Sequence, residues 1–244
     1  MKHPFTMIGL VLVLLSSFPL FLMAREDYIQ NKIMDRYEVA HSYTQQGWSE
    51  PIDVQSITVN DIHIELQEIP TGKKATRTMW DADEGVEAGD IVQLQILVDG
   101  KAVSSADEIW LSNRDRGGRY WSWLDVLRVK DKKTQTERIA IVQRLTDDDE
   151  QYENRAWKIV WIDVDGTVTE EKMTYAERSD NPLGVRLTMF SGTTLMSMGY
   201  YSDIFHYYPS LLYPILYPFG TVILGLLLMA FGAFRQMLAR RNNL

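Results

Sequence analysis

The sequence contains no cysteine among its 244 residues. Disulfide bonds, thiolate metal sites and a cysteine nucleophile are therefore excluded. A lipoprotein anchor is also excluded, because it needs a cysteine directly after an N-terminal apolar segment. Disulfides are common in oxidising compartments but are not obligatory there, so this absence does not assign the protein to a compartment.

Histidine is scarce, and the four that occur (His3, His41, His63 and His206) are far apart in the sequence. No two lie within four residues of each other, so no local pair of imidazoles is available to a metal. The sequence also lacks a Gly-x-Ser-x-Gly elbow and a glycine-rich phosphate loop. We therefore expect no metal, no cofactor and no enzymatic activity.

Acidic residues are missing from both ends of the chain. All 33 lie between residues 25 and 210 together with 21 of the 25 basic residues, so this middle part has a net charge of −12. Nucleic-acid binding needs a basic surface, and we expect no nucleic-acid partner. An acidic domain is also repelled by anionic lipid headgroups, so we expect it to stand off the membrane.

The two ends are long apolar runs without charge. Residues 5–23 and 211–234 carry no charged side chain, and ~20 such residues are enough to cross the hydrocarbon core. Arg235, Arg240 and Arg241 follow the second run and indicate a cytoplasmic C-terminus. Since two crossings return a chain to its starting side, the sequence predicts a two-pass bacterial inner-membrane protein. Both termini would be cytoplasmic, the middle would be periplasmic or extracellular, and the lipid bilayer would be a partner.

Two interpretations of the first apolar run remain open. In a cleaved signal peptide, Ala24 would stand before the cleavage site, but Leu22 is unsuitable at the −3 position. The run is also longer than the usual core of a signal peptide, which favours an uncleaved anchor. Arg25, Lys32 and Arg36 follow this run and oppose the predicted orientation, so the cleaner signal after the second run decides it.

The segment after the first run is predicted to be a helical stalk over residues 25–47. Its apolar residues Ile29, Ile33, Tyr37 and Ala40 recur at spacings of three and four. This narrow stripe would pack either on the protein's own domain or on a neighbouring subunit. A homo-oligomer is thus one of the two arrangements that the stripe allows.

An antiparallel β domain is predicted for residues 48–192. Apolar and polar residues alternate in short runs such as Ile62–Ile69 and Ile91–Val98. Turn signals such as Asp99-Gly100 separate the runs. We expect no helix within the domain, and Val185–Phe190 is predicted as its last clear strand. Many short strands joined by tight turns favour a β sandwich or a barrel-like meander.

The aromatic residues between the β domain and the second apolar run are predicted to lie at the membrane surface. The predicted organisation therefore has seven parts, from a cytoplasmic tail through helix, stalk, β domain, surface segment and helix to a second cytoplasmic tail. Their bounds are 1–4, 5–24, 25–47, 48–192, 193–210, 211–234 and 235–244.

A basic loop followed by aromatic residues is the candidate binding site of the β domain. The residues are Arg114, Arg116, Arg119, Tyr120, Trp121 and Trp123. Guanidinium groups bind carboxylates and phosphates in a bidentate manner, and aromatic rings stack on sugar faces. The loop is thus predicted to contact a glycan or a protein. The alternative is that the arginines form salt bridges within the domain and the tryptophans belong to its core.

The sequence Ile162-Asp163-Val164-Asp165-Gly166-Thr167 resembles the nucleophile motif of haloacid dehalogenase-type phosphatases. In that family an apolar strand ends in Asp-x-Asp-Gly-Thr. The resemblance implies a Rossmann-like α/β domain with magnesium, in which Asp163 attacks phosphorus and Asp165 serves as acid and base. The chain departs from the family after the motif, because neither helix–strand alternation nor a second acidic pair follows. The alternative is a hairpin turn between two amphipathic strands.

These features together predict a non-enzymatic accessory or scaffold subunit of a bacterial envelope complex. It would act through its extracytoplasmic β domain, with membrane or periplasmic proteins as partners. One alternative is an extracytoplasmic ligand- or glycan-binding sensor module, and a remote one is a haloacid dehalogenase-like phosphatase. Neither apolar run carries a charged side chain, so ion conduction or proton relay by one chain is not supported.

Overall fold

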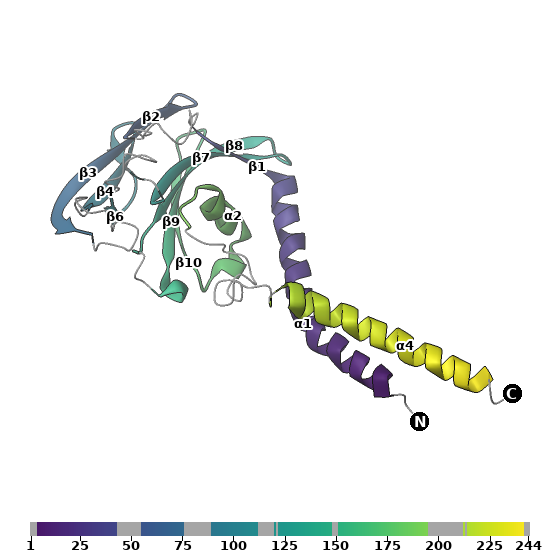
Figure 1. The fold of residues 1–244 in the computed structure, drawn as a ribbon. Coiled ribbons are helices and arrows are strands. Elements are labelled where there is room, and N and C mark those ends of the chain that lie inside the picture. Colours follow the sequence, from purple (N-terminus) through teal and green to yellow (C-terminus); the bar gives the residue numbers. More distant parts are fainter. Residues whose placement is uncertain are drawn as a thin grey trace, which may run out of the picture. The chain divides into compact units, whose positions relative to one another are not determined.

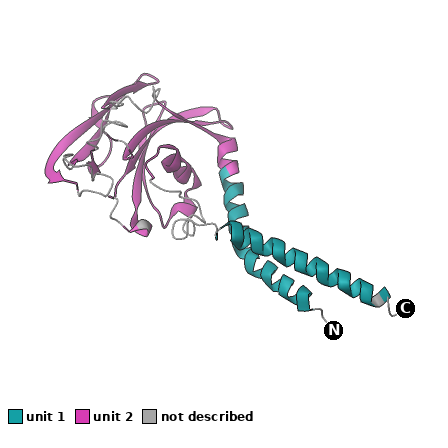
Figure 2. Cartoon of the chain, viewed as in Figure 1, with its two compact units in different colours: residues 1–30, 199–244 teal, residues 31–198 magenta. Residues whose placement is uncertain are grey.

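The computed structural model describes residues 4–42, 55–75, 89–111, 120, 122–147, 151–194, 212 and 214–241, the side chains of Tyr152 and Arg240 excepted. Figure 1 shows the elements along the chain, and Figure 2 shows that the chain divides into two compact units. Unit 1 comprises residues 1–30 and 199–244, and unit 2 comprises residues 31–198.

Unit 1 is built from the two apolar ends of the chain. Helix α1 (Pro4–Arg36) begins in this unit, and a π-helical turn, η4 (Ile215–Gly220), leads into helix α4 (Thr221–Arg241). Two helical stretches, Pro4–Arg36 and Ile215–Ala239, are long and apolar enough to cross a membrane. The first predicted apolar run is therefore helical, the second is helical from Ile215, and α4 continues beyond the predicted limit at residue 234.

The two helices of unit 1 lie antiparallel. Near the start of α1, the ring of Phe5 packs edge-on against Phe231, with 5.4 Å between ring centroids. Further along α1, the hydroxyl groups of Ser16 and Thr221 share a hydrogen bond of 2.6 Å. As the residue number rises along α1 it falls along the partner helix, so Pro4 and the C-terminal part of α4 lie at the same end of the pair.

Small residues allow the backbones of this pair to approach closely. A Cβ atom added to Gly225 would lie 2.7 Å from the carbonyl oxygen of Gly9, which is too close for a real contact. A Cβ atom on Gly232 would likewise collide with Thr6. Close approach at small residues is the usual basis of helix pairing in a bilayer, where dispersion contacts replace the hydrophobic effect.

The predicted stalk is wrong beyond Arg36, where the helix ends. The next residues form strand β1 (Tyr37–His41), which pairs with a strand of the β domain. The Arg36 guanidinium donates two hydrogen bonds to the Asp131 carboxylate, at 2.8 and 3.0 Å, and so holds the end of α1 on the domain. Tyr37 and Val39 pack against the same core at a spacing of two, as alternate residues of a strand do.

Among its described residues, unit 2 holds two mainly antiparallel sheets that do not close into a barrel. Sheet A has the order β1-β7-β8-β9-β10; in sheet B the order is β2-β3-β4-β5, and β6 also pairs with β4. The further strands of sheet A are β7 (Leu124–Asp131), β8 (Thr136–Arg144), β9 (Ala156–Asp163) and β10 (Val168–Thr174). Those of sheet B are β2 (Ser56–Val59), β3 (Ile62–Lys74), β4 (Asp90–Val98), β5 (Lys101–Ala102) and β6 (Asp107–Trp110).

Each face of sheet A is covered by a separate apolar core. The first core lies between the two sheets and includes Ile64 and Leu94 from sheet B and Ile141 and Val160 from sheet A, all fully buried. The second core lies between the opposite face of sheet A and helix α2 (Pro182–Phe190). The domain thus has three layers, which explains why sheet A strands are apolar on both faces.

Helix α2 replaces the predicted last strand Val185–Phe190, and that prediction is wrong. The Asn181 side chain accepts a hydrogen bond of 2.9 Å from the Gly184 amide, and Pro182 stands in the first turn. Both features are typical of a helix start. The short apolar run fits either structure by its period, and the cap is the local feature that favours the helix.

Tight turns join neighbouring strands where the sequence predicts them. Asp99 and Gly100 both have positive φ between β4 and β5, and Gly166 has φ +81° between β9 and β10. Two short 3-10 helices, η2 (Tyr152–Asn154) and η3 (Arg178–Asp180), lie in longer connections. The predicted membrane-surface segment over 193–210 lies almost entirely outside the described residues.

Candidate functional site

The predicted binding loop is described only at its end. Arg114, Arg116, Arg119 and Trp121 lie outside the described residues. Tyr120 is buried, and its hydroxyl group donates a hydrogen bond to the Glu68 carboxylate. These observations do not test a binding role of the loop, but the ring of Tyr120 is buried and not exposed to solvent.

Trp123 is also buried and belongs to the core between the sheets. Its ring stacks on Trp110 of β6, with 4.7 Å between the ring centroids and 19° between the planes. The guanidinium carbon of Arg144 lies 3.5 Å from the centroid of the Trp123 ring. Trp123 therefore matches the alternative in which the tryptophans belong to the core, because its ring fills the core and covers a buried cation.

The Asp-x-Asp pair of the phosphatase-like motif lies on an antiparallel hairpin. Asp163 ends β9 and forms an ion pair with Arg138 on the neighbouring strand β8. Asp165 lies in the turn, where its carboxylate accepts the Thr167 amide at 2.9 Å, and this hydrogen bond holds the pKa of Asp165 below its ordinary value. The Rossmann-like fold that the resemblance implies is not observed, because the motif closes a β hairpin.

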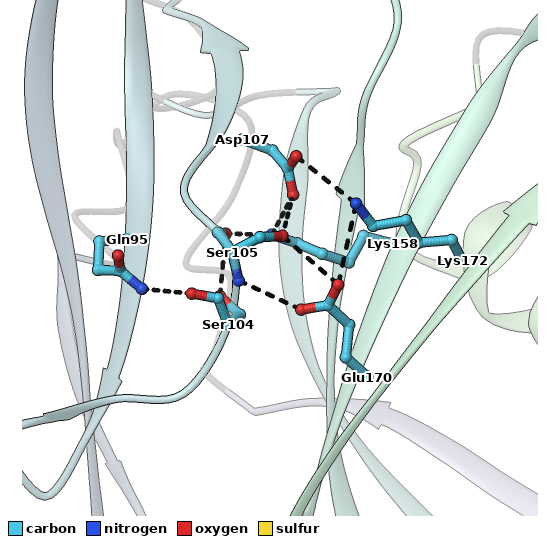
Figure 3. A network of polar contacts seen from close by, with 7 residues as sticks. All are labelled: Gln95, Ser104, Ser105, Asp107, Lys158, Glu170 and Lys172. Atoms are coloured by element: carbon cyan, nitrogen blue, oxygen red, sulfur yellow. Dashed lines mark hydrogen bonds and ion pairs between the residues drawn. The ribbon is translucent and has the colours of Figure 1, made fainter.

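A cluster of charged side chains joins the two sheets. Lys158 on β9 of sheet A is fully buried. Its ammonium group donates hydrogen bonds to Asp107 Oδ2 on β6 of sheet B, at 2.8 Å, and to the Ser105 carbonyl oxygen, at 2.9 Å (Figure 3). A buried ammonium group without partners is very unfavourable, so these two acceptors are what allow a lysine at this position.

Two residues of strand β10 complete this inter-sheet charge cluster. Lys172, which is half exposed, lies 3.7 Å from Asp107 Oδ1 and 3.9 Å from Glu170 Oε1. The Ser105 amide donates to Glu170 at 3.4 Å, and the single Ser105 hydroxyl proton is shared between Asp107 Oδ2 at 2.7 Å and, more weakly, Glu170 Oε1 at 3.4 Å. The cluster thus comprises Ser105, Asp107, Lys158, Glu170 and Lys172, as Figure 3 shows.

The electrostatics of the cluster favour an ionised Asp107. Burial by itself raises the pKa of this carboxyl group. Hydrogen bonds from Lys158 and Ser105, and then the charges of Lys158 and Lys172, act in the opposite direction and together outweigh burial. The pKa of Asp107 therefore lies below its ordinary value, and the pair with Lys158 is an ion pair at neutral pH.

A buried amide lies beside this cluster on the inner face of sheet A. Gln143 on β8 is directly opposite Lys158 on β9, and Lys172 on β10 is opposite Lys158 on its other side. Gln143 is fully buried, and neither its oxygen nor its nitrogen has a hydrogen-bond partner among the described residues. An amide in this condition is unfavourable for the fold.

The sequence contains a signal for this cluster, which lies outside the predicted binding loop. Lys158 stands in the apolar run Trp157–Ile162, and the period of two puts it on the same face as Val160 and Ile162. A lysine on the inner face of such a strand requires a buried anion from another element. That the anion is Asp107 depends on the packing of sheet B and has no sequence signal.

Among the described residues, no group of three histidine, aspartate or glutamate side chains could hold a metal ion. No family model, no curated protein and no solved structure matches the chain. The molecule's own geometry is therefore the basis for proposing a function.

Proposed function

We propose that the protein is a non-enzymatic two-pass membrane protein that holds a β domain outside the cytoplasm as an accessory or scaffold subunit of a bacterial envelope complex. The observation that carries this proposal is the antiparallel pairing of the two apolar terminal helices. An antiparallel pair that crosses a bilayer puts the residues between its helices, and hence unit 2, on one side. Arg235, Arg240 and Arg241 assign the opposite side to the cytoplasm.

The β domain supports a role in binding rather than catalysis. Its two candidate catalytic carboxylates are engaged in structure, Asp163 with Arg138 and Asp165 in its own turn. Its charged cluster joins the two sheets. What the domain offers to other molecules is then its surface, and membrane or periplasmic proteins are the partners that this proposal names.

The membrane topology can be tested directly, because the natural chain has no cysteine to be labelled. Val164 is 66% exposed in a turn of unit 2, and Arg241 is exposed at the end of α4. A membrane-impermeant maleimide should label Val164→Cys in intact bacterial cells and Arg241→Cys only after permeabilisation. The reverse pattern would contradict the orientation, and labelling of both in intact cells would contradict a membrane-spanning pair.

The scaffold role requires a second experiment. In mild detergent, after crosslinking in cells, a scaffold subunit should co-purify with a constant set of membrane or periplasmic proteins. It should show no thermal shift with cell-wall fragments or sugars. A shift that Arg116→Ala abolishes would instead identify a sensor module. Magnesium-dependent phosphatase activity that Asp163→Asn abolishes would identify an enzyme.

A further inference from the structure

Lys158 and Asp107 place an amine beside a carboxyl group in a geometry suited to amide formation. The two groups come from different sheets, and Lys158 Nζ lies 2.8 Å from Asp107 Oδ2. A carboxyl carbon is then within roughly 3–4 Å of the nitrogen, near the range of productive attack. The Ser105 carbonyl oxygen accepts a second hydrogen bond from Nζ and so restricts the orientation of the amine.

We propose that Lys158 and Asp107 condense to an isopeptide bond that crosslinks the two sheets. The reaction needs no oxidant and no second substrate. The Nζ–Cγ bond forms and one Cγ–Oδ bond breaks. Of the three protons of the ammonium group, one stays on the amide nitrogen and two leave with the carboxylate oxygen as water.

Burial is the driving force for this condensation. Lys158 is fully buried and Asp107 is 26% exposed, so both charges have lost much of their hydration. A buried ion pair is stabilised by mutual attraction but bears the desolvation penalty of two ions. The amide is neutral and avoids that penalty, and its remaining N–H can still donate to the Ser105 carbonyl. Holding both reactants in one fold also replaces the entropy cost of a bimolecular encounter.

The neighbours of Asp107 set the rate of the reaction. One proton must move from the amine to the carboxylate before attack, and the Ser105 hydroxyl and Lys172 oppose this step because they stabilise the ionised carboxylate. We therefore expect slow formation after folding. Glu170 is a positioning residue, since it accepts a hydrogen bond from the Ser105 amide and so holds the residue whose carbonyl oxygen orients the Lys158 amine.

The crosslink would supply a covalent tie to a domain that has no cysteine. Its ends lie on β6 and β9 and are 51 residues apart in the sequence. Such a tie resists separation of the two sheets, and its effect on stability is comparable to that of a disulfide closing a loop of the same length.

Intact-mass measurement of the full chain, purified in detergent, tests the proposal. The wild-type protein should have a mass lower by one water than Lys158→Arg prepared in the same way, after correction for the substitution. This comparison cancels any processing of the termini. Protease digestion should release one branched peptide that joins the segment of Asp107 to the segment of Lys158.

Matched variants test which side chains the condensation requires. Lys172→Arg keeps the exposed charge beside Asp107 and should still lose one water. Asp107→Ala should retain its full mass and unfold at a temperature lower by about 10 °C. Glu170→Gln should lose water over a longer time course, and its rate should depend on pH differently from that of the wild type, which a purely structural change would not produce.

Because the wild-type chain is itself the decisive sample, the test does not depend on any variant folding. A wild-type mass equal to that of the sequence after several days at neutral pH, with no branched peptide, would overturn the proposal. Lys158 and Asp107 would then be an ordinary inter-sheet ion pair.

Discussion

Neighbouring polar residues on the inner face of sheet A have different environments. Lys158 has two acceptors, Asp107 Oδ2 and the Ser105 carbonyl, both within 3 Å. The side chain of Gln143 is equally buried on the adjacent strand, but neither of its amide atoms has a partner among the described residues. At the residue scale, Lys158 is thus satisfied within the core, whereas the unpaired amide of Gln143 lowers the stability of the fold.

Replacing this amide by an apolar group of similar shape should not weaken the domain. We expect Gln143→Met to leave stability unchanged or to raise it by up to about 1 kcal/mol, because it removes an unsatisfied buried amide. Thermal unfolding of the full chain in detergent, followed by near-ultraviolet circular dichroism, measures this effect. Gln143→Ala is the control and should destabilise through the cavity it leaves. Clear destabilisation by Gln143→Met would show that the amide has a bound partner.

At the element scale, strand β1 is held to the domain by a titratable contact. His41 at its end donates a hydrogen bond of 2.8 Å from Nδ1 to the buried carboxylate of Asp125 on β7, and its ring stacks on Phe190 of α2 at 4.8 Å. The hydrogen bond to Asp125 raises the pKa of His41, burial lowers it by less, and the negative charge of Asp125 raises it further. The net result is a raised pKa.

The sign of the pH dependence follows from this shift. The stability contributed by protonated His41 is fully present below the unfolded pKa of about 6.5. It is lost as the pH rises through the raised pKa of the folded state. As the pH rises between these two pKa values of His41, the unfolding temperature of the wild type should fall more than that of His41→Phe. His63→Gln, on sheet B, is the control and should keep the wild-type profile. Identical profiles for wild type and His41→Phe would contradict the assignment.

The pairing of α1 with α4 depends on small residues. Gly225→Leu should separate the helices, because even a Cβ atom at this position meets the carbonyl oxygen of Gly9. Cysteines placed at Phe5 and Phe231 should form a disulfide under mild oxidation in the parent chain, where their rings are in contact. The yield should fall severalfold in Gly225→Leu. Leu227→Phe adds comparable bulk at an exposed position of α4 and should leave the yield unchanged.

At the scale of the whole molecule, the chain consists of two units of different construction. Unit 1 is a pair of apolar helices whose exposed side chains are largely leucine, isoleucine and phenylalanine. Unit 2 has its own two cores and a first strand that continues directly from α1. Such a unit has what a domain needs in order to fold alone.

A fragment of residues 31–198 should therefore fold without the terminal helices. We expect a cooperative thermal transition and a near-ultraviolet spectrum matching that of unit 2 in the full chain. A shorter fragment that begins at residue 43 lacks β1 and the Arg36–Asp131 ion pair, and it should unfold at a lower temperature. Failure of the longer fragment to fold would show that unit 2 depends on unit 1.

Composition and local patterns determined much of this protein without its tertiary structure. Uncharged apolar runs of about 19 or more residues favour helices, because a helix satisfies every backbone group within its own segment. Hairpin turns such as Asp99-Gly100 and Asp165-Gly166 are equally local, because they depend on which residues tolerate positive φ. The antiparallel β domain between two terminal helices follows from these signals.

Tertiary structure decided what local signals leave ambiguous. Tyr37–His41 became a strand because β7 supplies its hydrogen bonds, and Val185–Phe190 became a helix because it covers the second face of sheet A. Trp123 became a core residue, and Lys158 acquired Asp107 as a partner, only when sheet B packed on sheet A. The physical reason is that sequence period specifies which face of an element is apolar, whereas its partner depends on contacts between residues far apart in the chain.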